Sequence, residues 1–146
     1  MVLRDASRPV SMAVARMAIS RVDRRAPLDA NALAAASFVR NWIRYCHEWP
    51  EYVAGMERLA TLRAGDCDDM VTCLAALLIR LGYRPGSLRW VIGWRRGRPV
   101  HVWLSVRGKA TGQWHPLDPS TWRVEPGQSP APYGRFGRIT RHRLEV

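Results

Sequence analysis

Three separated residues in this chain have the types that a cysteine nucleophile requires. Cys67 stands between two aspartates, His101 lies in a later apolar segment, and Asp118 follows that segment. A thiol needs a base that takes its proton, and the base needs a third group that fixes its tautomer and stabilises its charged form. This order of residue types indicates nucleophilic catalysis.

Cys67 stands at the predicted start of a buried helix. Gly65 and Asp66 give a turn and a helix cap, and Asp69 has the spacing of a capping-box partner. Backbone N–H groups and the positive end of the helix dipole favour a thiolate there and can hold an oxyanion. The charges of Asp68 and Asp69 oppose the thiolate, and we expect both to be ordinary first-turn partners of the dipole.

The residues after Asp69 predict the centre of the domain. The run from Met70 to Leu81 is apolar on nearly all sides, which is typical of a helix buried in a core, and Gly82 supplies a left-handed stop. The pattern then changes to strands over 88–94, 100–106 and 113–118. Neighbouring antiparallel strands would place His101 beside Asp118, with the sheet packed on the Cys67 helix.

The remaining elements complete an α+β arrangement, with helices first and an antiparallel meander after them. We expect helices over 10–22 and 30–47, and either a short amphipathic helix or an ordered connection over 51–65. Residues 125–137 read as a surface loop and 139–146 as a last edge strand or a mobile tail. At this length we expect one domain over 1–146, with 1–28 as a helical extension and 125–146 as loop and tail.

Several alternatives stay open at this stage. Cys67 alone could be a buried structural cysteine, and His115 could compete with His101 as the base. Cys46 and Cys73 are expected in the core. A zinc site built from the cysteines and His47 has no recognised ligand spacing, so no metal or cofactor is expected.

The net charge of +11 comes from 23 basic and 12 acidic residues. It suits an acidic partner such as nucleic acid, a membrane surface or an acidic protein, or simply an arginine-rich surface, and no nucleic-acid motif is present. Arg95, Arg96 and Arg98 form a basic hairpin tip that is either solvated or holds an acidic substrate segment. Three cysteines, no apolar run of bilayer length and a poor signal peptide indicate a reducing, cytoplasmic setting.

Taken together, these segments resemble the transglutaminase-like superfamily, within the papain-like cysteine-enzyme folds. The resemblance covers about residues 30–122 and is closest to short bacterial and phage-encoded members. It rests on three motifs in the family's order: Gly65-Asp66-Cys67-Asp68-Asp69, His101-Val102-Trp103, and Trp114-His115-Pro116-Leu117-Asp118-Pro119-Ser120.

The resemblance implies Cys67 as nucleophile, His101 as base and Asp118 as orienting acid in acyl transfer through a thioester. It implies a protein or peptide substrate, with hydrolysis of a peptide or isopeptide amide as the expected reaction. Family members also use an aromatic N–H for the oxyanion, for which Trp42 is a candidate, and Trp103 is a candidate wall of the cleft. The rival readings are a catalytically silent interaction or virion-assembly module on the same fold, and a nucleic-acid-associated protein.

Overall fold

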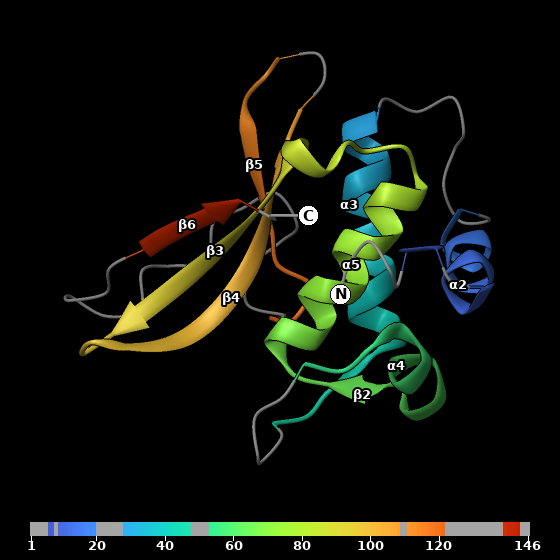
Figure 1. Cartoon of the computed structure of the whole chain (residues 1–146), viewed down its shortest axis with the longest axis horizontal. Coiled ribbons are helices and arrows are strands. Elements are labelled where there is room, and N and C mark those ends of the chain that lie inside the picture. The colour runs from blue at the N-terminus through green and yellow to red at the C-terminus, as the bar shows by residue number, and fades with distance from the viewer. Residues whose placement is uncertain are drawn as a thin grey trace.

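The chain forms an antiparallel sheet with helices on one side of it, as the computed structural model in Figure 1 shows. The structure describes residues 6–7, 9–19, 28–47, 53–108, 111–121 and 139–143. The sheet has four strands in the order β5-β4-β3-β6, namely Trp114–Leu117, Arg98–Arg107, Leu88–Arg95 and Ile139–Arg143. Helix α5 (Cys67–Arg80) packs directly on β4. The predicted α+β class is confirmed.

Helix α5 is the centre of the molecule because its sequence is apolar all round. Every residue from Asp69 to Leu78 is buried, and Gly82 ends the helix with a φ of 89°. One face of α5 contacts β4, while other faces contact α3 (Leu28–Trp42) and α2 (Pro9–Ile19). A helix surrounded in this way has a fixed direction, so its first residue is held at a defined place beside the sheet.

The predicted meander is confirmed, with strands slightly longer or shorter than expected. Strands β3 and β4 pair from Leu88↔Val106 to Arg95↔Arg98, and β5 pairs with β4 from Leu104↔Leu117 to Arg107↔Trp114. The last segment adds a strand, since β6 pairs with β3. Residues 144–146, the expected loop over 125–137 and the expected helix end at 20–22 lie outside the described residues.

The second helix ends earlier than its sequence pattern predicts. Helix α3 ends at Trp42 and not at His47, because the chain beyond it pairs in parallel with a later segment. Strands β1 (Arg44–Tyr45) and β2 (Ala64–Gly65) form this two-stranded sheet, which Cys46 extends by donating its N–H to the Gly65 carbonyl at 2.9 Å. Between them lies α4 (Met56–Leu62), the short helix that was one of two options for this region.

None of the helices in the described residues is long and apolar enough to cross a bilayer.

Candidate active site

The start of α5 is fixed by the hydrogen bonds of three aspartates, Asp66, Asp68 and Asp69. Asp66 caps the helix, and the predicted capping box with Asp69 is confirmed. The Asp66 N–H donates to Asp69 Oδ2 at 3.3 Å, and the Asp69 N–H also reaches Asp68 Oδ1 at 2.9 Å. Asp69 is fully buried and accepts a further hydrogen bond from the Ala54 N–H, which ties the segment before α4 to the helix start. These contacts hold Cys67 as the first residue of the helix.

The Cys67 thiol is partly buried and is held as a thiol. Burial is the main cause that raises the pKa of Cys67 from 9.0 to about 11, and the charges of Asp66, Asp68 and Asp118 raise it further. A hydrogen bond with the Val102 backbone acts in the opposite direction. The favourable helix end expected from the sequence is therefore outweighed, and Cys67 stays protonated at neutral pH.

His101 and Asp118 contact each other across the sheet. Leu104 pairs with Leu117, so Asp118 comes opposite Trp103 and is a diagonal neighbour of His101. His101 Nε2 lies 2.6 Å from Asp118 Oδ2, and both side chains are largely buried, at 8% and 1% exposed. With a carboxylate at Nε2, that nitrogen carries the proton of the neutral ring, which leaves Nδ1 as the nitrogen able to act as a base.

Asp118 is itself held from two sides. Its Oδ1 accepts hydrogen bonds from the Ser120 N–H at 2.9 Å and the Ser120 hydroxyl at 2.7 Å. Its main-chain carbonyl accepts a hydrogen bond from Arg40, a buried residue of α3. The carboxylate orientation is therefore set both by the turn that follows β5 and by a helix far away in the chain.

Cys67 and His101 line one cavity of about 620 Å³ between the start of α5 and the β3–β4 hairpin. Its polar lining consists of Tyr45, His47, Asp66, Cys67, Asp68 and His101. Its apolar lining consists of Trp90, Ile92, Pro99, Val100 and Val102. The structure thus brings together the three sequence-predicted residues, two of them on the cavity and the third directly behind His101.

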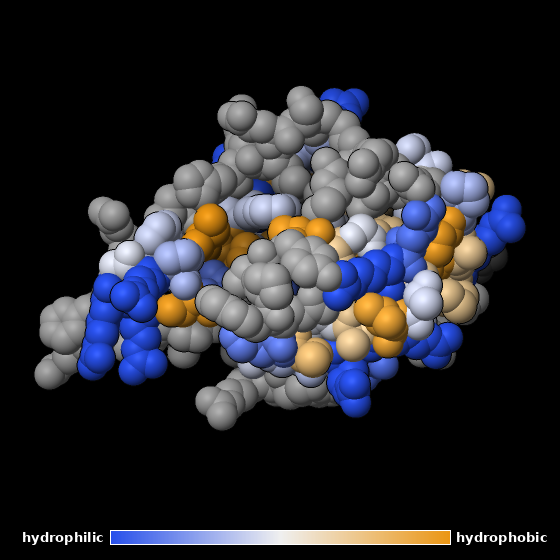
Figure 2. Space-filling model, turned by 60° about the horizontal axis from the view of Figure 1, so that its bottom comes forward, coloured by the Kyte–Doolittle hydropathy of each residue, from blue (hydrophilic) through white to orange (hydrophobic). Residues whose placement is uncertain are grey.

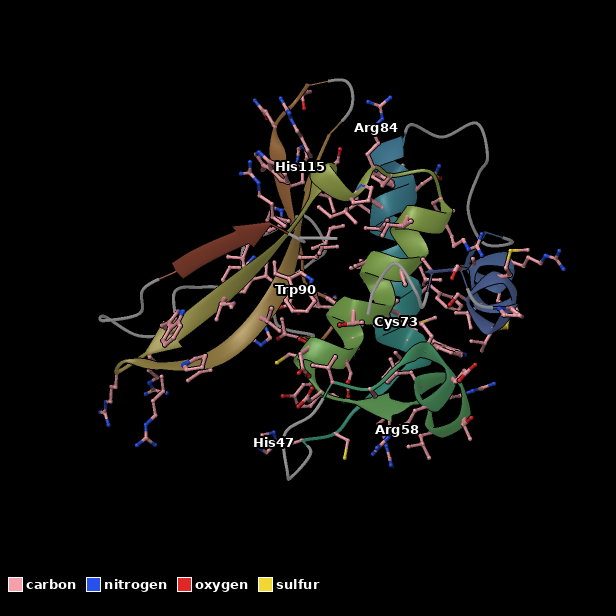
Figure 3. The ribbon with its side chains drawn as sticks, in the orientation of Figure 1. His47, Arg58, Cys73, Arg84, Trp90 and His115 are labelled. Carbon is pink, nitrogen blue, oxygen red and sulfur yellow. The ribbon has the colours of Figure 1, made fainter. Side chains whose placement is uncertain are left out.

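The other candidate residues lie elsewhere. Trp103 is buried and stacks on the His101 ring at 5.9 Å, so it supports the histidine and does not line the cavity. Trp42 stacks on Phe38 and is also absent from the cavity lining. His115 lies on β5 opposite Val106, and in Figure 3 it projects far from the start of α5.

The two remaining cysteines differ from each other. Cys73 is buried in α5, as predicted. The prediction that Cys46 lies in the core is wrong, because α3 ends before it and leaves it exposed beyond β1. One group of carboxylates in the described residues, Asp66, Asp68 and Asp69, brings its ligand atoms within 4.8 Å of one another, and oxygen ligands of this kind suit hard divalent cations.

Asp68, one carboxyl of this group beside the thiol, has a raised pKa. Burial is the largest cause that raises the pKa of Asp68 to about 7, followed by its hydrogen bond and charge interaction with Asp66. A buried carboxyl next to a second carboxyl is costly to ionise, so Asp68 keeps its proton to a higher pH than an ordinary aspartate.

Two polar cavity residues, Tyr45 and His47, were not predicted from the sequence, and Trp90 was expected only in general terms as a core or groove residue. Tyr45 and His47 reach the cavity because the β1–β2 pairing carries their segment past the start of α5. Trp90 reaches it from β3, and its indole N–H is buried with no hydrogen-bond partner in the described part of the chain. Figure 3 shows Trp90 between the sheet and α5. The alternation of inward and outward side chains along β3 could have placed Trp90 on the side that faces α5. The β1–β2 pairing, which positions Tyr45 and His47, has no pattern in the local sequence that would predict it.

Comparisons with known proteins agree with this geometry. The sequence profile of the transglutaminase-like superfamily matches residues 16–119. No curated protein matches the chain. A candidate cysteine protease from Cytophaga hutchinsonii has a similar structure, with a TM-score of 0.59 and 16% identity over 93% of this chain. This chain spans only 52% of that protein.

A second similar structure is LapG of Legionella pneumophila. It has a TM-score of 0.57 and 15% identity, and the alignment covers 75% of this chain and 72% of LapG. The EGTA-treated form of LapG gives the same TM-score at 14% identity, over 80% of this chain and 77% of that one. At such identities the similarity shows a shared cysteine-protease-type fold.

Proposed function

The chain belongs to the transglutaminase-like superfamily, and we propose that it is a cysteine-dependent acyl-transfer enzyme that hydrolyses a peptide or isopeptide amide. The observation that carries the proposal is the shared cavity of Cys67 and His101, with His101 held by Asp118 at 2.6 Å. A nucleophile, a base and a carboxylate that orients the base are the parts that this chemistry needs.

The first half-reaction forms a thioester. Because the pKa of Cys67 is raised to about 11, the thiol keeps its proton until the substrate is attacked, and His101 Nδ1 takes that proton as the S–C bond forms. The carbonyl oxygen becomes an oxyanion, for which the Cys67 N–H is a donor because the first residue of a helix has no i−4 acceptor. One such donor is worth about 3 kcal/mol. The C–N bond then breaks and the amine leaves with the proton from His101.

The second half-reaction releases the acyl group. His101 takes a proton from water, the C–O bond forms, the C–S bond breaks, and the Cys67 sulfur recovers the proton. An amine in place of water would give a new amide instead. We propose hydrolysis, in which water enters the cavity that Cys67 and His101 line.

The direct test is trapping of the thioester. The full chain is incubated with a peptide library, products are identified by mass spectrometry, and hydroxylamine is added to convert the thioester into a hydroxamate. We expect cleavage by the wild type and by Cys46→Ser, which removes an exposed cysteine, and no cleavage by Cys67→Ala or His101→Ala. Cleavage that survives Cys67→Ala would reject the proposal.

A second candidate is a catalytically silent binding module on the same fold. The observation that favours it is the raised pKa of Cys67, which leaves the free protein without a preformed thiolate. This candidate predicts no acyl-enzyme with any library member and unchanged peptide binding by Cys67→Ala. Detection of the hydroxamate decides against it.

A further inference from the structure

We propose that the arginine tip, which consists of Arg95, Arg96 and Arg98 at the end of the β3–β4 hairpin, binds an acidic segment of the substrate peptide. The inference rests on the proposed function and names a feature of its substrate. The arginine tip lies next to the cavity along the chain, since the strand that carries His101 also carries Arg98 at its start.

The hairpin connects the cavity to the tip without interruption. Pro99, Val100, His101 and Val102 of β4 all line the cavity, and Arg98 is the next residue outward. Arg98 is three positions from His101, and a strand rises about 3.3 Å per residue, so the two lie about 10 Å apart along β4. An extended peptide with its scissile amide at Cys67 reaches the arginines about three to five residues away.

The edge of β4 along this path is open to such a peptide. Strand β5 pairs with β4 only over Leu104 to Arg107, so Arg98 to Trp103 have a strand partner on the β3 side alone within the described residues. Val100, at 44% exposed, presents an apolar surface on this stretch. Figure 2 shows hydrophobic side chains beside a dense group of hydrophilic ones at the end of the molecule formed by the hairpin.

The arginines themselves are available for a partner. Arg95, Arg96 and Arg98 are all exposed, and within the described part of the chain none of their guanidinium groups makes a hydrogen bond or an ion pair. Guanidinium groups bind carboxylates with paired hydrogen bonds, so three of them on one tip match a run of acidic side chains.

The turn of the hairpin fixes where the arginine side chains stand. The two-residue turn has positive φ at both central residues, 50° at Arg96 and 76° at Gly97. Asn-Gly is the pair that this kind of hairpin turn prefers, because a long side chain is disfavoured at positive φ. Arg96 therefore occupies a position that asparagine would fill with less strain, between the two other arginines of the tip.

The charges around the cavity favour a peptide whose acidic segment lies on the arginine tip. The acidic residues of the cavity, Asp66 and Asp68, lie at the start of α5, whereas the arginine tip lies at the far end of the hairpin. An acidic segment is repelled from the first and attracted to the second, so the field orients the peptide along β4.

Binding is measured with the inactive full-length Cys67→Ala chain and fluorescent peptides of one length. Each peptide has an apolar residue for the cavity, followed after about three residues by a run of glutamates, or by glutamines in the matched control. We expect the glutamate peptide to bind roughly tenfold more tightly than the control, with a steep loss of affinity as salt is raised. Moving the glutamates directly beside the apolar residue is expected to remove the advantage.

Three variants separate the arginine tip from general charge. Replacing all three arginines by glutamate is expected to abolish the preference for the glutamate peptide. Arg84→Glu reverses the charge of an exposed arginine that lies away from the hairpin, at the top of the view in Figure 3, and is expected to leave the preference intact. Arg96→Asn is expected to raise the melting temperature while weakening the glutamate peptide about two- to threefold, a combination that a purely structural arginine would not give.

Three outcomes of these binding experiments would change the assignment of the arginine tip or of the function. Equal binding of the two peptides, or equal loss in Arg84→Glu and the triple variant, would show that the tip has no specific acidic partner. Tighter, tip-dependent binding of single-stranded DNA or of phosphatidylserine vesicles would assign the tip to a nucleic acid or a membrane. Tip-dependent peptide binding without any hydrolysis by the wild type would instead reject the proposed function and leave the assignment of the tip intact.

Discussion

Arg40 of α3 donates a hydrogen bond to the main-chain carbonyl of Asp118, a residue 78 positions later in the chain. Both residues are buried, at 7% and 1% exposed. The contact joins helix α3 to the end of β5. Asp118 directly follows this strand, and its carboxylate contacts His101. Arg40 does not line the cavity, so we expect it to act on the site by positioning Asp118.

Arg40→Met is expected to lower turnover about tenfold while leaving KM unchanged. The variant keeps the length of the side chain but leaves a buried carbonyl without its donor, which costs about 1–3 kcal/mol of stability. Thermal unfolding and steady-state kinetics measure the two effects. Arg40→Lys retains a donor and is expected to recover part of both losses. Normal turnover in Arg40→Met would show that β5 alone fixes Asp118.

Ser120→Ala tests the other support of the carboxylate. The substitution removes the hydroxyl that donates to Asp118 Oδ1 at 2.7 Å and keeps the N–H that donates to the same atom at 2.9 Å. We expect turnover to fall about three- to tenfold, with about 1 kcal/mol lost in stability. Ser120→Thr keeps a hydroxyl and serves as the control. If threonine and alanine behave alike, the hydroxyl has no part in holding Asp118.

Asp68→Asn is expected to make Cys67 more reactive. Asp68, with a pKa of about 7, ionises above neutral pH, and its charge is one of the causes that raise the pKa of Cys67. At pH 8–9 the variant should therefore alkylate roughly three- to tenfold faster with iodoacetamide, read by mass spectrometry of the Cys67 peptide. Below about pH 6 Asp68 is protonated, so the two proteins should converge.

The matched control for this experiment is Glu57→Gln, which removes an exposed carboxylate from α4. It should leave the Cys67 alkylation profile unchanged. Equal rates for the wild type and Asp68→Asn at pH 8–9 would mean that the charge of Asp68 does not contribute to the raised pKa of the thiol.

The parts of the site that the sequence predicted are those with local patterns. The capping residues of α5, its apolar surround and the alternation of β4 and β5 are each visible within a short window, and together they bring Cys67, His101 and Asp118 to one place. The His101–Asp118 contact follows from strand register alone, because two joined antiparallel strands leave few choices for which residues face each other.

The parts that the sequence did not predict depend on contacts between distant segments. The helical pattern continues past Trp42, and only pairing with Ala64–Gly65 ends the helix there and turns His47 toward the cavity. Arg40 lies on a helix whose sequence gives no indication of Asp118. The raised pKa of Cys67 also required the structure, since burial outweighs the helix dipole only once the packing around the thiol is known.

Gly65→Ala is expected to disturb the site without touching any reacting group. A Cβ at Gly65 would come within 2.7 Å of Asp69 Oδ2 and 3.0 Å of Leu59 Cδ2, and the buried Asp69 cannot move away without losing its hydrogen bonds to the Ala54 and Asp66 amides. Overpacking of this kind costs about 1–3 kcal/mol. We expect a lower melting temperature and a loss of peptide cleavage, because Cys67 shifts with the helix start. Gly86→Ala, where a new Cβ meets nothing within 4 Å, is the control that should leave both measurements near those of the wild type. A Gly65→Ala chain with normal stability and cleavage would show that the contact between the β2 backbone and Asp69 does not position the nucleophile.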